Sequence, residues 1–335
     1  MNSRERIRTI IAGGTPDRCG FWLGNPHADS WPIYFRYFGV STEEEVRVIL
    51  SDDFRWIPPD FHSCYKHPQG KQPFKIEGKI AHGTAGPFAH VEDPAELDEY
   101  EWPSVKYLDF AEVLDALRDA GPYYRASGMW SPFYHNVMDL FGMDVYMMNM
   151  HLNPAVVEAV TDRVCTFYHE ANELFFPLAG DEVDGHFFGN DFGTQLNLIC
   201  GPRQFDQFVM PWFRRFTAQG HRHGHQVILH SCGSVYKVID RLIDSGVDCL
   251  HPLQALAANM DAETLAREFK GRIAFLGAID TQQLLVHGTP AEVKAEVRRV
   301  KALLGPNLIV SPSHEAILPN VPPQNVAAMA EAARE

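Results

Sequence analysis

The sequence predicts a single (β/α)8 barrel, in which a ring of parallel strands is surrounded by helices. Short apolar runs alternate with helical patterns along most of the chain, and polar residues follow many of the runs. Such alternation predicts a parallel sheet with helices on its faces. Polar residues at the strand ends favour a barrel, because barrel sites are built from the loops at those ends.

The length fits this fold as one domain. The chain has 335 residues, of which 45% are hydrophobic, and it shows no linker or low-complexity stretch. A barrel reaches this size as one unit, so we expect a single domain over residues 1–335. An open, doubly wound sheet is the alternative architecture that the same alternation allows.

Eight strands are expected in order along the chain. Each is a short run of apolar or β-branched residues that ends at Gly, Pro or a polar side chain. Their approximate ranges are 20–24, 53–57, 124–130, 183–189, 226–230, 247–251, 272–276 and 307–311.

Capping signals mark the helices between these strands. Ser3 is the candidate N-cap of the first helix, and Asp93 and Asn153 each precede a proline at a first helical position. Thr289 begins a capping box with Glu292. Residues 62–90 have weak periodicity, and the runs 75–77 and 79–81 predict a small hairpin insertion there.

The net charge of −14 limits the possible partners. A chain this acidic, without a basic run, is not expected to bind nucleic acid or an anionic membrane. No apolar stretch of about 18 residues is present, and the first residues lack the apolar core of a signal peptide. We therefore expect a cytoplasmic protein whose six cysteines are reduced.

The candidate metal ligands follow the strand at 226–230, which runs into His230-Ser231-Cys232-Gly233. Residues i and i+2 of an extended segment point to the same side, so the imidazole and the thiol are expected side by side. Both groups are suitable zinc ligands. The alternative is that Cys232 packs as a small apolar residue and His230 caps the following helix.

Other polar residues lie at or just past the predicted strand ends. We expect catalytic roles for His27, Asp60 and Asp191, although either aspartate could instead cap a helix. The candidate substrate-binding residues are Asn25, Trp130, Asn190, His251 and Gln254. Three further histidines, His221, His223 and His225, are expected at a solvated helix end and not as ligands.

Several segments resemble the uroporphyrinogen decarboxylase superfamily. These are His230-Ser231-Cys232-Gly233, Gly277-Ala278-Ile279-Asp280, the stretch from Gly288 to Val293 and the tail from Pro323 to Met329. The resemblance covers most of the chain and is strongest from about 180 to 335. It implies one distorted (β/α)8 barrel and one of two chemistries, either metal-free decarboxylation of a tetrapyrrole or zinc-dependent methyl transfer linked to a corrinoid.

His230 and Cys232 match the methyltransferase branch. In that branch a third ligand, usually Cys, lies near the C-terminus, and here its place falls on Ser311-Pro312-Ser313-His314. The resemblance therefore implies His314 as the third zinc ligand, and zinc accepts imidazole as well as thiolate. This set has one thiolate fewer than the usual one, so the metal is expected to be the stronger Lewis acid.

The decarboxylase branch has an Arg-rich first loop that grips substrate carboxylates, whereas the loop after the first strand here has no arginine before Arg36. The predicted function is therefore methyl transfer between a small methylated compound, a thiol or a methoxy compound, and a corrinoid on a partner protein. A tetrapyrrole decarboxylase or a catalytically diverged barrel is the alternative. The protein could form a homodimer with any of these functions.

Overall fold

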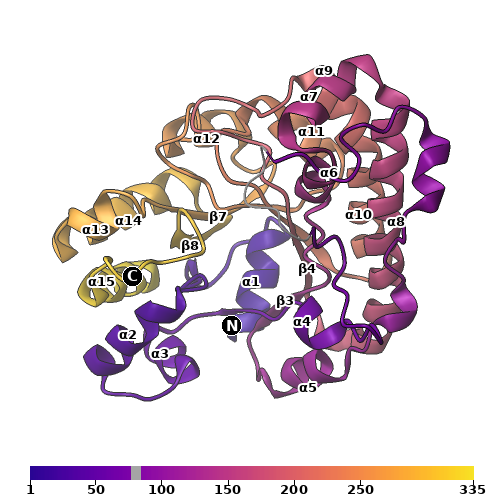
Figure 1. Ribbon diagram of the computed structural model, residues 1–335. Helices are drawn as coiled ribbons and strands as arrows, with labels where there is room; N and C mark the ends of the chain where they lie inside the picture. Colours follow the sequence, from indigo (N-terminus) through magenta and orange to yellow (C-terminus); the bar gives the residue numbers. More distant parts are fainter. Residues whose placement is uncertain (77–83) are drawn as a thin grey trace.

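The computed structural model describes residues 1–76 and 84–335 and forms one eight-stranded parallel sheet wound into a barrel (Figure 1). Neighbouring strands follow the order β1-β8-β7-β6-β5-β4-β3-β2. Their bounds are β1 Gly20–Phe21, β2 Phe54–Trp56, β3 Tyr124–Ser127, β4 Gly185–Gly189, β5 Gln226–His230, β6 Cys249–His251, β7 Ala274–Ile279 and β8 Leu308–Pro312. Each predicted strand is present within a few residues of its expected bounds, so the predicted (β/α)8 barrel is confirmed.

An aspartate pair joins β1 and β2, where the barrel closes. The Asp53 N–H donates to the Phe21 carbonyl at 2.9 Å. In return, the Phe21 N–H donates to the Asp53 carboxylate at 3.1 Å, and the Leu23 N–H donates to the Asp52 carboxylate at 3.2 Å. Carboxylate oxygens thus take the place of carbonyls that a longer strand would offer, and they satisfy the backbone at this seam.

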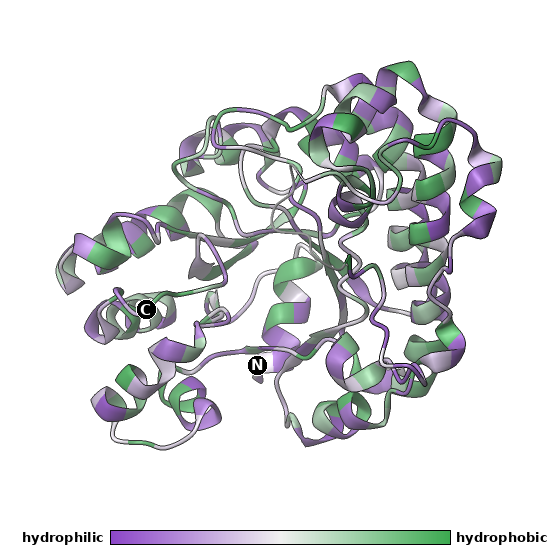
Figure 2. Ribbon diagram, in the orientation of Figure 1, coloured by the Kyte–Doolittle hydropathy of each residue, from purple (hydrophilic) through white to green (hydrophobic). Residues whose placement is uncertain are grey.

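Amphipathic helices form the outer layer, and hydrophobic and hydrophilic residues alternate along them in Figure 2. Their bounds are α1 Ser3–Ile11, α2 Trp31–Phe38, α3 Glu43–Leu50, α4 Phe61–Cys64, α5 Ala111–Asp119, α6 Phe133–Phe141, α7 Met143–Leu152, α8 Pro154–Ala179, α9 Pro202–Gln204, α10 Met210–Arg222, α11 Ile239–Asp244, α12 Ala262–Phe269, α13 Leu284–His287, α14 Pro290–Leu304 and α15 Pro323–Arg334. Among the described residues, none of these helices combines the length and the apolarity needed to cross a membrane.

Aromatic side chains fill the barrel interior. Phe54 lies 5.0 Å from Trp22 and 5.2 Å from Tyr124 between ring centroids, and Phe187 lies 5.9 Å from Trp22. Helix α1 adds its isoleucines, including Ile10, to the same buried cluster. The interior is therefore a packed core, and the chemistry has to lie at an open end of the barrel.

Two helix starts differ from the sequence prediction. Asn2, not Ser3, caps α1, because its side chain accepts from the Glu5 N–H in a capping box. The Asn153 side chain makes no cap bond with α8 and instead donates to the Glu92 carbonyl at 2.8 Å. The Asn153 side chain therefore binds a carbonyl that is distant in the sequence and does not cap its own helix. The local sequence pattern does not predict such a contact.

The other predicted caps are confirmed. Asp93 caps a 3-10 helix at Pro94–Glu99, and Thr289 forms the expected capping box with Glu292 at the start of α14. The predicted hairpin at 75–77 and 79–81 lies largely on residues 77–83, outside the described residues.

His225 is buried, which corrects the prediction of a solvated helix end. It is only 4% exposed and packs against Phe176 at 4.7 Å between centroids, close to His186 of β4. Burial lowers the pKa of His225 to about 4 and that of His186 to about 3. His221 and His223 lie nearer the surface and pair with carboxylates.

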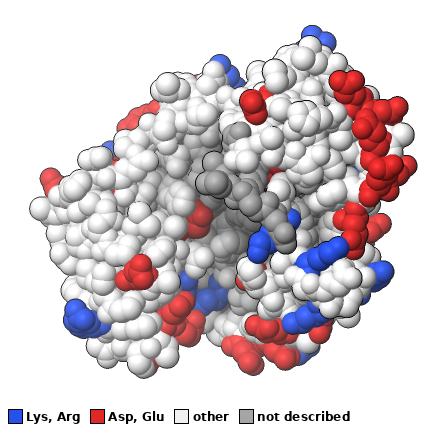
Figure 3. Space-filling model, viewed as in Figure 1, with Lys and Arg blue, Asp and Glu red and all other residues white. Residues whose placement is uncertain are grey.

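On the face seen in Figure 3, most charged side chains lie toward the edges.

Candidate metal centre

His230 and Cys232 lie side by side at the C-terminal end of β5. The Cys232 sulfur is 3.4 Å from Nε2 of His230. His230 is the last residue of β5, and Cys232 follows two positions later in the loop. The juxtaposition expected from the His-x-Cys spacing is therefore present.

Asp191, just beyond β4, meets this pair. Its Oδ1 lies 3.3 Å from Nε2 of His230 and accepts a hydrogen bond from the Cys232 N–H at 2.8 Å. Burial alone would raise the pKa of Asp191, but interactions with His230 and the Cys232 N–H hold it below its usual range. The carboxylate is therefore ionised and fixed against the loop that carries the thiol.

The other nitrogen of His230 faces His251 and Glu315. Nδ1 of His230 lies 3.0 Å from Nδ1 of His251 and 3.5 Å from Oε2 of Glu315. Burial and the neighbouring His230 lower the pKa of His251 well below its ordinary value. Although burial opposes it, Asp191, Cys232 and Glu315 raise the pKa of His230. The 3.0 Å separation is that of a direct hydrogen bond between the two imidazoles.

Two groups of ligand atoms thus share His230. Within each group the atoms lie within 4.8 Å of one another, and the groups are Asp191 with His230 and Cys232, and His251 with His230 and Glu315. The sequence interpretation did not include Glu315. Its only sequence signal was a carboxylate directly after His314, at the end of the last strand.

His314 lies at the same mouth but outside both close groups. Its ring centroid is 6.4 Å from that of His230, and its Nδ1 accepts from the Ala316 N–H at 3.1 Å. Interaction with Cys232, and the charge of Glu315, raise the pKa of His314 despite partial burial. The imidazole therefore faces the thiol without joining the tight donor set.

A cavity of about 420 Å³ adjoins this cluster and brings together three predicted site residues, Asn25, Asp60 and Trp130. The ring of Trp130 connects the two regions, because its centroid lies 5.2 Å from that of His230. Trp56 also lines the cavity and lies 4.9 Å from Trp130 between centroids. Among the described residues, no Lys or Arg lines this cavity.

Asp60 has a local role as well, because it caps α4 by accepting from the His62 N–H at 2.9 Å. The Asn25 N–H donates to the Glu315 carbonyl at 2.7 Å, which ties the first loop to the last one. Both residues therefore sit in the cavity wall with their backbone position fixed.

The remaining predicted residues lie farther from the donor atoms. The amide of Asn190 is buried, accepts from the Tyr134 N–H at 2.8 Å and donates to the Ser131 carbonyl at 3.0 Å, so it fixes the loop after β3. Gln254 accepts from the Gly233 N–H at 2.7 Å beside the thiol loop. The exposed His27 caps the 3-10 helix Ala28–Ser30 and belongs to neither donor group.

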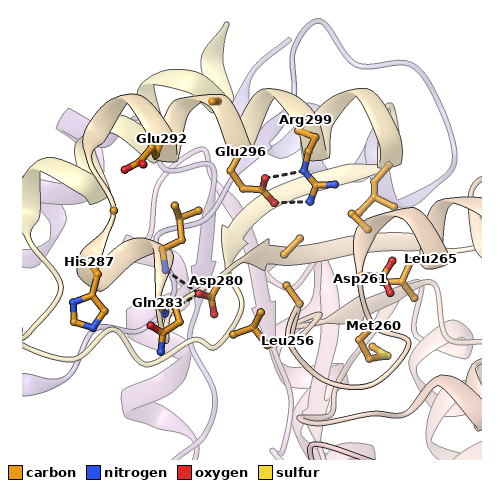
Figure 4. Close-up of a pocket in the computed structure, with 17 residues that line it drawn as sticks. Leu256, Met260, Asp261, Leu265, Asp280, Gln283, His287, Glu292, Glu296 and Arg299 are labelled. Carbon is orange, nitrogen blue, oxygen red and sulfur yellow. Dashed lines mark hydrogen bonds and ion pairs between the residues drawn. The ribbon is translucent and has the colours of Figure 1, made fainter.

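A larger cavity of about 750 Å³ lies between α12, α13 and α14 (Figure 4). Its carboxylates serve local structure. Asp280 accepts backbone N–H bonds at the start of α13, and Glu296 pairs with Arg299 at 2.6 Å. No residue of the two donor groups lines either cavity, but Trp130 of the smaller one lies 5.2 Å from His230 between ring centroids. This contact connects the smaller cavity, and not the larger one, with the donor groups.

The fold and the site together define a (β/α)8 barrel with a candidate metal centre at the C-terminal ends of its strands. The sequence model of the family "Uroporphyrinogen decarboxylase (URO-D)" matches residues 137–335, and the chain belongs to this family.

A solved structure with the same fold is a methyltransferase from Methanosarcina mazei. It superposes with a TM-score of 0.68 at 16% identity, and the match covers 99% of this chain and 98% of that one. At this identity the similarity establishes the shared fold. No curated protein matches the sequence.

Proposed function

We propose that this protein is a zinc-dependent methyltransferase that moves a methyl group between a small methylated compound and a corrinoid carried on a partner protein. The observation that carries the proposal is the convergence of a thiol, imidazoles and carboxylates beside a cavity at the barrel mouth. Membership of the URO-D family and the fold shared with a methyltransferase are consistent with it.

The residues present fit zinc. The metal takes imidazole, thiolate and carboxylate ligands, and a catalytic zinc site needs three protein ligands and one open position. His230 and Cys232 provide the first two types, and Asp191 provides the third within the same close group. Zinc bound there would supply a Lewis acid that activates a thiol or polarises a methoxy oxygen.

The chain's own residues would prepare the substrate. Trp56 and Trp130 give the cavity aromatic walls that exclude water from the side facing His230. Asp60 and Asn25 offer a carboxylate and an amide in the same wall, which can orient a polar group of a small compound. Binding of this kind positions the methylated atom beside the donor cluster.

The cavity disfavours the alternative function of tetrapyrrole decarboxylation. A substrate with several carboxylates requires bidentate arginine partners. The described cavity wall carries the Asp60 carboxylate and no cationic side chain. A neutral or cationic methylated compound suits this wall better than a polyanion.

The test is a methyl-transfer assay with purified, zinc-loaded protein. Free cob(I)alamin replaces the protein-bound corrinoid, methylated thiols and methoxy compounds are offered as donors, and methylcobalamin formation is followed by absorbance. Cys232→Ser is the matched inactive control. The proposal predicts transfer that depends on Cys232. Carbon dioxide release from a uroporphyrinogen substrate, or equal transfer by Cys232→Ser, would refute it.

A further inference from the structure

We propose that Asp191 is the third zinc ligand, together with His230 and Cys232. In this arrangement His251 and Glu315 hold the His230 ring from its opposite side. The inference rests on the proposed function, because it assigns the ligands of the zinc site assumed there. It differs from the set that the sequence implies, in which the third ligand follows the last strand.

The spacing of the donor atoms supports this set. Zinc bonds of about 2.0–2.1 Å to N or O and about 2.3 Å to S, at tetrahedral angles, place N and O about 3.3 Å apart and N and S about 3.5 Å apart. The observed separations from Nε2 of His230 are 3.3 Å to Asp191 Oδ1 and 3.4 Å to Cys232 Sγ. Both separations from Nε2 of His230 therefore match those expected around a shared tetrahedral metal, and all three donor atoms lie within 4.8 Å of one another.

The other donor group has a different geometry. Two nitrogens bound to one tetrahedral zinc would be about 3.3 Å apart, whereas the Nδ1 atoms of His230 and His251 are 3.0 Å apart. That distance is typical of a direct N–H···N hydrogen bond. A metal-bound imidazole commonly donates its second N–H to a neighbouring acceptor, which fixes the ring and its tautomer. His251 fills this role, and Oε2 of Glu315 lies 3.5 Å from the same Nδ1 of His230.

Asp191 is also held in place before any metal binds. Its Oδ1 accepts the Cys232 N–H at 2.8 Å, so the carboxylate is anchored to the backbone that carries the thiol. His314 is anchored as well, because its Nδ1 accepts the Ala316 N–H at 3.1 Å, and its side chain interacts with Cys232. Its ring centroid, however, lies 6.4 Å from that of His230, and it belongs to neither close donor group. A preorganised donor binds metal with less loss of conformational freedom than one that must first move.

The charge balance points the same way. A thiolate and a carboxylate together neutralise the two positive charges of zinc, whereas one thiolate with two imidazoles leaves one charge uncompensated. The set with Asp191 therefore carries the same total charge as one imidazole with two thiolates. Replacing a thiolate by a carboxylate keeps the site neutral while making its ligands harder.

The experiment measures zinc affinity by competition with a chromophoric chelator, using zinc alone as the probe. The variants are Asp191→Ala, Asp191→Asn and His314→Ala, with Asp60→Asn as the control carboxylate outside the donor groups. Asp191→Asn keeps an oxygen that can accept the Cys232 N–H, so it separates metal binding from loop anchoring. Circular dichroism confirms that each variant is folded.

We expect Asp191→Ala to weaken zinc binding by more than about a hundredfold, because loss of a ligand exceeds the effect of losing a ligand's supporting hydrogen bond. Asp191→Asn should fall between Asp191→Ala and the unaltered protein, and His314→Ala and Asp60→Asn should change the affinity by less than about threefold. In the cobalt(II)-loaded protein, the Asp191 variants should alter the visible ligand-field band and retain the thiolate charge-transfer band.

Retained affinity in both Asp191 variants, or a hundredfold loss in His314→Ala, would overturn the ligand assignment. A wild-type protein that binds no zinc would overturn both the assignment and the metal dependence proposed above. If the expected affinities were found without any methyl transfer, the ligand assignment would stand and the proposed function would fail.

Discussion

The two ends of the barrel hold their carboxylates in different ways. At the N-terminal end, the fully buried carboxylate of Asp53 is saturated. It accepts from Arg6 at 2.8 Å, from Arg18 at 2.9 Å through two nitrogens and from the Phe21 N–H. Asp184, which precedes β4, is bound in the same manner by Arg4 and by other arginines.

At the C-terminal end, the carboxylates of Asp191 and Glu315 face imidazoles, and among the described residues no arginine pairs with them. Nε2 of His251 and Oε2 of Glu315 lack hydrogen-bond partners among the described residues, as do both ring nitrogens of His225 near the N-terminal end. We therefore expect the arginine network of the closed end to serve folding, and the imidazoles and carboxylates of the open mouth to serve chemistry.

A substitution in the arginine network at the N-terminal end should give the largest loss of stability. Asp53→Ala removes the acceptor for two arginines and for a backbone N–H at the barrel seam, and it leaves the buried Arg6 with one partner fewer. Loss of one partner from a buried ion pair costs about 3–5 kcal/mol. We expect a loss of that size in the free energy of unfolding, measured by urea denaturation.

The matched control is Asp206→Ala, which removes a surface ion pair with Arg241. Exposed pairs contribute about 0–1 kcal/mol. The comparison of the two ends would be wrong if both variants lost the same stability, or if Asp53→Ala changed the zinc affinity of the folded protein.

A substitution in the donor group at the C-terminal end should lower activity without lowering stability. Cys232→Ser removes the thiol from the donor group and leaves the backbone N–H that binds Asp191 in place. We expect at least a loss of about a hundredfold in methyl transfer and in zinc affinity. The unfolding midpoint of the metal-free protein should stay close to that of the unaltered protein. A large drop in that midpoint would show that the thiol has a structural role instead.

The sequence predicted the barrel because its signal is repetitive. The prediction rests on eight apolar runs that alternate with helical patterns. One misplaced boundary, such as the helix cap assigned to Ser3, does not change this alternation, so the predicted fold stays the same. The His-x-Cys pair was predictable for a similar reason, because the two residues are neighbours on one strand end and their geometry is local.

The rest of the site depends on contacts between distant segments. Asp191 reaches Cys232 from another strand, and Glu315 reaches His230 from the loop after β8. In the sequence, Asp191 was one of several catalytic candidates after predicted strands, with a helix cap as the alternative, and Glu315 was not singled out. The burial of His225 could not be predicted for the same reason, because its neighbour Phe176 lies on the distant helix α8. Register between elements, and not residue type, decides these contacts.

The buried histidines near the N-terminal end should set an acid limit on stability. The pKa of His186 is lowered to about 3 and that of His225 to about 4 by burial, with nearby His223 adding positive charge around His225. Below pH 6.5 the unfolded chain gains protons that these folded residues do not accept, so the folded state loses stability as pH falls. From pH 6.5 to 5 the loss should be about 2 kcal/mol for each histidine.

Denaturation at several pH values tests this with His225→Gln, which cannot titrate. That variant should lose about 2 kcal/mol less than the unaltered protein between pH 6.5 and 5. His27→Gln supplies the control for the substitution itself, because it removes an imidazole that is half exposed and not buried. An unaltered slope in His225→Gln would mean that His225 becomes protonated without unfolding.

The smallest expected effect separates two roles of one mouth residue. Asp60 both caps α4 and lines the cavity. Asn is as good a cap as Asp, so Asp60→Asn should change the free energy of unfolding by a few tenths of a kcal/mol, whereas Asp60→Ala should cost about 1 kcal/mol. If the carboxylate also contacts substrate, both variants should raise KM equally in the methyl-transfer assay, although only Asp60→Ala loses stability. A KM that rises only in Asp60→Ala would show that the helix cap, and not the charge in the cavity wall, is what the mouth needs from this residue.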